Sequence, residues 1–160
     1  MEYSYLANKI SGGIDADDRY WQGLEENRFL LPRCAGCGRW MWPAHWRCGE
    51  CGSWESDWVD TEPVGTLYSW TRTWYKFDRV LERAAEVPYV VVLAELPNAG
   101  NSRVLGVLKG DESNLRIGVP VRGEIQRPSP VSKNYATIRW VIDPSAEGAQ
   151  QAHSGTKEVS

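Results

Sequence analysis

Cys34-Ala-Gly-Cys37-Gly and Cys48-Gly-Glu-Cys51-Gly are two matching motifs separated by a short loop. Two Cys-x-x-Cys pairs this close together are typical of a tetrahedral Zn²⁺ site with thiolate ligands. Each pair is followed by glycine, where a metal-binding turn often needs a positive φ that glycine adopts without steric cost. The sequence therefore predicts a zinc ribbon in which Cys34, Cys37, Cys48 and Cys51 hold one ion.

Other uses of four cysteines fit this pattern less well. A thioredoxin-type redox pair needs a helix after its second cysteine, whereas residues 38–43 indicate a strand and a turn. Structural disulfides suit a secreted chain, and the N-terminus does not resemble a signal peptide. An iron ion stays open, as in a rubredoxin that transfers electrons, because four sulfurs accept either metal. Four thiolates fill a tetrahedral shell, so the ion is predicted to be structural.

The composition excludes several classes of protein. The chain has 160 residues, with 18 Lys and Arg against 21 Asp and Glu and a net charge of −3. No basic run provides the electrostatic footprint of a nucleic-acid-binding protein. No apolar stretch approaches the roughly 20 residues that a membrane span needs. We therefore expect a soluble, cytoplasmic protein without a membrane contact.

Tryptophan is unusually frequent, with nine Trp against two Phe. Trp is enriched at interface hot spots and where one end of a side chain is apolar and the other wet. Some of these rings would form the small core of the ribbon. The others are predicted to contact a protein partner, and the candidates are Trp40, Trp42 and Trp46.

The residue patterns divide the chain into four parts. Residues 1–30 form an N-terminal helical segment with a helix over 17–27, which Asp15 or Asp17 can cap. The zinc ribbon covers 31–60, and residues 59–63 indicate a short link. Residues 61–143 are rich in strands. The tail, 144–160, has nothing to bury and is predicted to be disordered.

Five stretches in the third part have the alternating or apolar pattern of strands. A helical pattern over 78–86 interrupts the first two, and turn residues separate the others. Five short strands in this order suggest a small Greek-key barrel, the OB-fold. The predicted fold is mainly β, with an N-terminal helix, a rubredoxin-like zinc ribbon and a C-terminal five-stranded OB-fold barrel. The predicted strands cover 66–75, 89–96, 103–109, 121–127 and 136–142.

The order of motifs resembles one known family. After the helix come Arg33-Cys-x-x-Cys-Gly, Pro43, Cys48-x-x-Cys-Gly-Ser, Gly65-Thr-Leu-Tyr-Ser and Gly118-x-Pro-Val. Zinc-ribbon/OB-fold proteins associated with acyl-CoA enzymes, long filed as a domain of unknown function, share this order. The resemblance covers about residues 16–143. The chain departs from the family in a longer, more charged insert over 76–87 and in the pair His45-Trp46.

This resemblance implies a non-catalytic accessory subunit. Members of the family assemble and stabilise thiolase-superfamily partners, which include thiolases, acyltransferases and retro-aldol lyases, for example in aromatic or steroid side-chain degradation. The implied assembly is a heterotetramer of two plus two, with a coenzyme A thioester bound mainly by the partner. A hotdog-fold enoyl-CoA hydratase is the alternative partner that the family offers.

The remaining residue types agree with a non-catalytic role. Thiolase-type chemistry needs a cysteine nucleophile and positioned acid and base groups. All four cysteines belong to the predicted metal site, and the only histidines are His45 and His153. The sequence has no Gly-x-Ser-x-Gly, no phosphate-binding glycine loop and no His-Glu-x-x-His. We expect little or no catalysis by the chain alone.

Two weaker hypotheses concern the strand-rich half. Lys76, Arg79 and Arg83 could face the phosphates of coenzyme A, although a solvated helix face paired with Glu82 and Glu86 fits the same spacing.

Tyr68, Trp70 and Trp74 would share one strand face, as in a stacking platform for single-stranded nucleic acid. Such a protein also needs an electropositive groove, which the charge balance does not support.

Overall fold

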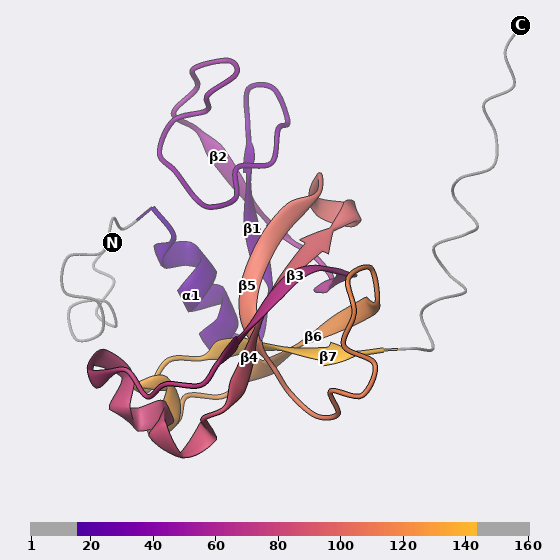
Figure 1. Ribbon diagram of the computed structural model, residues 1–160. Helices are drawn as coiled ribbons and strands as arrows, with labels where there is room; N and C mark the ends of the chain where they lie inside the picture. The colour runs from indigo at the N-terminus through magenta and orange to yellow at the C-terminus, as the bar shows by residue number, and fades with distance from the viewer. Residues whose placement is uncertain (1–15, 144–160) are drawn as a thin grey trace, which may run out of the picture.

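The molecule consists of a two-stranded ribbon and a closed five-stranded barrel. A helix packs beside them on one side (Figure 1). The computed structural model describes residues 16–143. Helix α1 covers Asp18–Glu25, and strands β1 (Leu30–Cys34) and β2 (Ser56–Asp60) pair antiparallel as the ribbon. The barrel contains β3 (Val64–Thr73), β4 (Tyr89–Leu96), β5 (Ser102–Leu108), β6 (Pro120–Gln126) and β7 (Thr137–Ile142). Short 3₁₀ helices follow β3, β4 and β6, namely η2 (Asp78–Glu86), η3 (Pro97–Ala99) and η4 (Pro130–Ser132).

The barrel closes in the order β3-β4-β5-β7-β6, with β6 returning to β3. All neighbours are antiparallel except β5 and β7, which run parallel. This closed Greek-key arrangement of five strands is an OB-fold. The predicted fold class is confirmed, and each predicted barrel strand begins within two residues of an observed strand.

The structure corrects two local predictions. Residues 59–63 are not simply a link, because β2 extends through Asp60 and pairs with β1. β2 reads Ser-Asp-Trp-Val-Asp and is too polar to suggest a strand by itself; it forms because the cysteine loops bring it beside β1. The insert over 78–86 is helical, as predicted, but it is a 3₁₀ helix and not an α-helix.

A β-bulge removes Tyr68 from the strand face that was predicted for Tyr68, Trp70 and Trp74. The pairing of β3 with β4 shifts between Leu67 and Ser69, so Tyr68 is the extra residue of the bulge. The ring of Tyr68 lies 3.6 Å from the guanidinium of Arg103 on the outer face of β5. Trp70 pairs instead with the inward-facing Val92. The continuous stacking platform therefore does not form.

One hydrophobic core connects the parts of the molecule. Trp140 at its centre is fully buried, and β4 alternates buried and half-buried residues along its whole length. Tyr20 and Leu24 of α1 and Leu31 of β1 belong to the same cluster as the barrel residues. The helix and the base of the ribbon are therefore packed onto the barrel as one unit.

Some predictions fall on residues that the structure does not describe. They are the tail over 144–160, His153, and Asp15 as a helix cap. Between residues 16 and 143 no helix has the length and apolar character to cross a membrane.

Candidate metal centre and the cleft beside it

The four cysteines converge at the tip of the ribbon. Their sulfur atoms all lie within 4.8 Å of one another, and none forms a disulfide. The Cys34 and Cys51 sulfurs are 3.5 Å apart, and those of Cys37 and Cys48 are 3.6 Å apart. A zinc ion with Zn–S bonds of about 2.3 Å places its sulfurs about 3.8 Å apart, so the cluster fits a tetrahedral ion.

Backbone N–H groups favour the thiolate form of two of these sulfurs. A hydrogen bond from the Cys51 N–H, followed by those from neighbouring thiols, lowers the pKa of Cys48 to about 7 against the cost of burial. Hydrogen bonds from the N–H groups of Cys37 and Gly36 likewise lower the pKa of Cys34. Metals bind the thiolate, so this part of the loop is preorganised for coordination.

The two cysteine loops are built in the same way. In each, the glycine after the second cysteine donates its N–H to the carbonyl of the first cysteine, at 2.9 Å in one loop and 3.0 Å in the other. Gly38 and Gly52 have φ values of +76° and +75°, as the sequence predicts.

Arginines cap both loops, a feature that we did not predict from the sequence. Nε of Arg33 donates to the carbonyl of Gly38 at 2.8 Å, and Nε of Arg47 donates to that of Gly52 at 3.0 Å. Each guanidinium also lies about 6 Å from an indole ring, that of Trp40 or Trp54. The signal in the sequence is the repeat Arg-Cys-x-x-Cys-Gly-x-Trp at 33–40 and 47–54.

We expect Gly52→Ala to destabilise the ribbon by about 1–2 kcal/mol, because alanine is strained at positive φ. A Cβ at this position would also lie 3.0 Å from the Arg47 guanidinium, which would have to move. Gly49→Ala in the same loop is the matched control, since its Cβ would meet nothing within 4 Å. Urea unfolding, followed by tryptophan fluorescence, measures both. Equal stability of the two variants would contradict this description of the loop.

The ribbon has almost no core of its own. Apart from Cys34 and Cys48, only Met41 belongs to its small buried cluster. The indole of Trp42 instead packs on Tyr20 of α1, with ring centroids 4.6 Å apart, and Tyr20 also contacts Phe29. The ribbon therefore depends on the metal site at its tip and on aromatic packing at its base.

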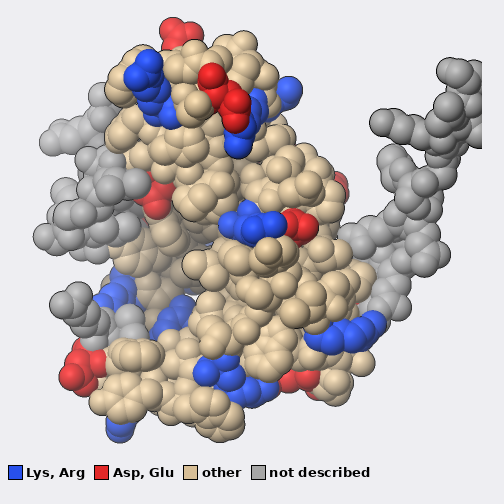
Figure 2. Space-filling view, turned by 45° about the horizontal axis from the view of Figure 1, so that its top comes forward, with Lys and Arg blue, Asp and Glu red and all other residues tan. Residues whose placement is uncertain are grey.

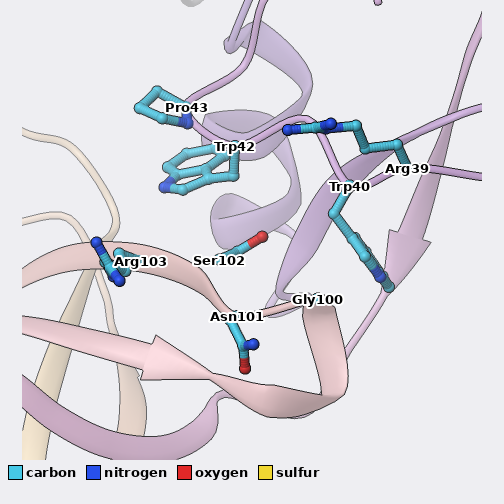
Figure 3. A pocket seen from close by; sticks show the side chains of 8 residues that line it. All are labelled: Arg39, Trp40, Trp42, Pro43, Gly100, Asn101, Ser102 and Arg103. Atoms are coloured by element: carbon cyan, nitrogen blue, oxygen red, sulfur yellow. The ribbon is translucent and has the colours of Figure 1, made fainter. Parts of the chain in front are cut away.

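A cleft of about 610 Å³ lies between the ribbon and the barrel (Figure 3). Trp42 and Pro43 form one side of the cleft. Asn101, in the turn before β5, and Arg103, in β5, form the other side. Gly100, at φ +62°, permits this arrangement, because a Cβ there would lie 2.5 Å from the Trp40 ring. The lining combines indole faces with guanidinium and amide groups, and both guanidinium groups already pair with glutamates, Arg39 with Glu50 and Arg103 with Glu95.

The three tryptophans predicted at a partner interface occupy different environments. Trp40 and Trp42 are half-buried, pack against the main core and line the cleft. Trp46 is 59% exposed on the ribbon surface. Their assignment to an interface remains a prediction, and only Trp46 presents most of its surface to solvent.

The basic residues of the insert are not gathered into one cluster of free charges. Arg83 donates to Glu86 at 3.0 Å and its guanidinium lies 5.7 Å from the Tyr89 ring centroid. Lys76 is exposed, and the side chain of Arg79 lies outside the described part of the structure. Figure 2 shows Lys and Arg scattered over the displayed face, without a continuous basic surface.

No catalytic constellation accompanies the metal centre within residues 16–143. Nδ1 of His45 is bonded to the carbonyl of Pro43 at 2.8 Å, and the ring lies on the exposed ribbon loop. The buried charged residues of the described region are Asp18 and Arg139. Arg139 donates to Gln126 and Glu86, which is a structural contact.

Two family models match consecutive parts of the chain. The rubredoxin-like zinc ribbon domain of ChsH2 matches residues 21–55, and the C-terminal OB-fold domain of ChsH2 matches residues 58–126. A curated protein of Thermomonospora curvata, a probable enoyl-CoA hydratase alpha subunit, is 30% identical over 109 residues. This match covers 68% of the chain but 33% of that protein, so the chain spans about a third of its curated relative.

Solved structures share the fold. A chain of the Ltp2-ChsH2(DUF35) aldolase has a TM-score of 0.69 and 23% identity, covering 83% of this chain and 98% of that one. A DUF35-family protein of unknown function from Sulfolobus solfataricus has a TM-score of 0.53 and 19% identity, covering 88% of this chain and 96% of that one. At these identities the similarity establishes a common architecture.

Proposed function

Because the chain belongs to the ChsH2 family of zinc-ribbon/OB-fold proteins, we propose that it is an accessory subunit of a heteromeric enzyme acting on acyl-CoA substrates. The observation that carries the proposal is the consecutive match of a ChsH2 zinc ribbon domain at residues 21–55 and a ChsH2 OB-fold domain at residues 58–126. A site of four sulfurs without an associated acid, base or nucleophile in the described residues supports a non-catalytic role.

The metal in this proposal is one structural zinc ion held by Cys34, Cys37, Cys48 and Cys51. Zinc would join the two cysteine loops at the tip of the ribbon. Four thiolates leave no position for a water molecule or a substrate. The ion therefore contributes to folding and assembly, and the reaction belongs to the partner.

The partner that we propose is a thiolase-superfamily protein that carries out thiolysis or retro-aldol cleavage. The similarity to a chain of the Ltp2-ChsH2(DUF35) aldolase supports a two-protein lyase of this kind. The curated relative, a probable enoyl-CoA hydratase alpha subunit, supports the second candidate, a complex with an enoyl-CoA hydratase. In either case we propose that the partner binds most of the coenzyme A thioester, in an assembly of two plus two chains.

The contribution of this chain to coenzyme A binding would be small. Of the three basic residues proposed to contact its phosphates, Arg83 already forms an ion pair with Glu86. Lys76 is the more accessible cation, and Arg79 completes the proposed set. The cleft at Trp40 and Trp42 and the exposed Trp46 are the ribbon surfaces proposed to contact the partner.

Co-expression tests the proposal. The chain is produced with the thiolase-superfamily protein encoded nearest to it and, in parallel, with the nearest hotdog-fold hydratase, and each mixture is resolved by size-exclusion chromatography with light scattering. We expect co-elution with the thiolase-like protein at the mass of two plus two chains. Separate elution from both proteins would contradict the proposal, and co-elution with the hydratase alone would select the second candidate.

A further inference from the structure

Five large apolar side chains are exposed within one short stretch at the end of β3 and the start of its connection to β4. Their exposed fractions range from 41% to 72%. Since an aromatic side chain offers about 150–250 Å² of contact surface, the exposed area is on the order of 600 Å². This is at the upper end of the roughly 300–600 Å² found for the largest apolar patch of monomers. We call these residues the aromatic patch: Trp70, Trp74, Tyr75, Phe77 and Leu81.

The barrel leaves this stretch uncovered. β6 pairs with β3 only at Val64–Thr66, so the second half of β3 has β4 as its one neighbouring strand within the described barrel. The rings of Tyr75 and Phe77 contact each other edge to face, with centroids 5.5 Å apart. More than half of the surface of Trp74, Tyr75, Phe77 and Leu81 is exposed, so packing on the protein's own core does not account for these four side chains.

A buried arginine anchors the segment that follows. Arg139 of β7 is 7% exposed and donates to Gln126 at 2.8 Å and to Glu86 of η2 at 2.9 Å. Glu86 also accepts a bond from Arg83 at 3.0 Å. These contacts fix the C-terminal end of η2 against the barrel, and β4 holds the end of β3, so the segment that carries the patch is held at both ends. Preorganisation of this kind lowers the entropic cost of association.

The charges around the patch identify the chemistry of its partner. Arg72, between the two tryptophans, is neutralised by Glu112 at 2.6 Å. The other charges within residues 70–82 are Lys76 and Arg79 against Asp78 and Glu82, two of each sign. A stretch without net positive charge exerts no long-range attraction on the polyanionic backbone of a nucleic acid or on an anionic membrane surface. It fits an apolar, charge-poor protein surface, and Trp and Tyr are the residue types enriched at interface hot spots.

We propose that the aromatic patch is the docking surface for the catalytic subunit, which presents an apolar, charge-poor face to it. This inference rests on the proposed function. Its area is close to the roughly 800 Å² that one partner contributes to a standard interface. Figure 1 places the 74–86 segment at the end of the molecule opposite the cysteine loops, so the partner would contact the barrel as well as the ribbon.

The test compares two variants in the complex from native cells. The chain is tagged in the organism that produces it, the complex is purified, and each bound protein is identified by mass spectrometry. Trp74→Ser/Tyr75→Ser/Phe77→Ser removes the centre of the patch. Ile117→Ser in the turn before β6 is the matched control, because Ile117 is 71% exposed and Trp74 is 72% exposed. Affinities of the separately purified components are then measured by biolayer interferometry, with circular dichroism and zinc content as checks of folding.

We expect the triple variant to bind the co-purified partner at least about 100-fold more weakly and the control to stay within about threefold. Footprinting by hydroxyl radicals should show protection of Trp74 and Tyr75 in the complex. A triple variant that binds within threefold, or an equal loss in both variants, would overturn the inference. So would a wild-type chain that purifies alone, that forms only patch-dependent homodimers, or that binds vesicles of phosphatidylcholine and phosphatidylglycerol through the patch.

These outcomes separate the inference from the proposed function. A patch-dependent partner that is not a thiolase-superfamily protein would contradict the proposed function and support the docking surface. A thiolase-like partner whose affinity does not change in the triple variant would support the proposed function and overturn the docking surface.

Discussion

Replacing Cys48 by serine is expected to remove the bound metal and to unfold the ribbon while the barrel remains folded. Structural zinc contributes about 10–16 kcal/mol of apparent binding free energy in isolated finger peptides, and the ribbon has only a minimal core to offset its loss. The barrel keeps its own buried strands, with Trp140 at the centre. A chelator that removes the ion from the native chain should have the same effect.

Zinc analysis and hydrogen exchange together measure this result. In the serine variant, zinc should fall from one ion per chain to near zero, and amide exchange should accelerate across the cysteine loops, residues 34–56, but not across β4 and β5. Ala35→Ser is the matched control, because it adds the same hydroxyl to an exposed position of the neighbouring loop without removing a ligand. If the serine variant keeps both its zinc and its exchange protection, the assignment of Cys48 as a ligand is wrong.

Truncation of Tyr20 to alanine is expected to destabilise the whole molecule by about 3–5 kcal/mol, the range for large aromatic side chains in a core. Tyr20 is 3% exposed, and its ring contacts Trp21, Phe29 and Trp42. These contacts join α1, the base of the ribbon and the loop between the cysteine pairs. Their loss should therefore weaken both the stability of the barrel and the seating of the ribbon.

Tyr20→Phe keeps the ring and provides the control, with an expected loss below about 1.5 kcal/mol. Burial, together with the carboxylate of Asp17, raises the pKa of Tyr20, so the phenol is neutral across the physiological range and the control removes no charge. Urea denaturation gives the two stabilities, and tryptophan fluorescence reports the exposure of Trp42. A loss in the alanine variant as small as in the phenylalanine variant would show that the helix and the ribbon are not packed as one unit.

The elements set by local chemistry were predictable from the sequence. The cysteine loops follow from residue spacing and from the glycines that supply positive φ, at Gly38 and Gly52. β4 is a nearly continuous run of apolar and β-branched residues, and its predicted bounds are the observed ones. The order of the five strands then leaves few ways to close a small barrel.

The elements set by pairing and packing were not predictable in this way. The bulge at Tyr68 depends on how β3 meets β4, and a shift of one residue moves a side chain to the other face. β2 depends on a partner brought to it by the cysteine loops. The half-buried positions of Trp40 and Trp42 depend on α1 and on Gly100, neither of which is near them in the sequence.

Turnover by the isolated chain tests the central claim most directly. Zinc-loaded chain and its complex with the thiolase-like partner are each assayed for cleavage of an acyl-CoA thioester under the same conditions. The chain alone should be indistinguishable from the buffer, and the complex should turn over at the rate of an enzyme. Cleavage by the purified chain at a rate comparable to that of the complex would contradict the assignment of the reaction to the partner.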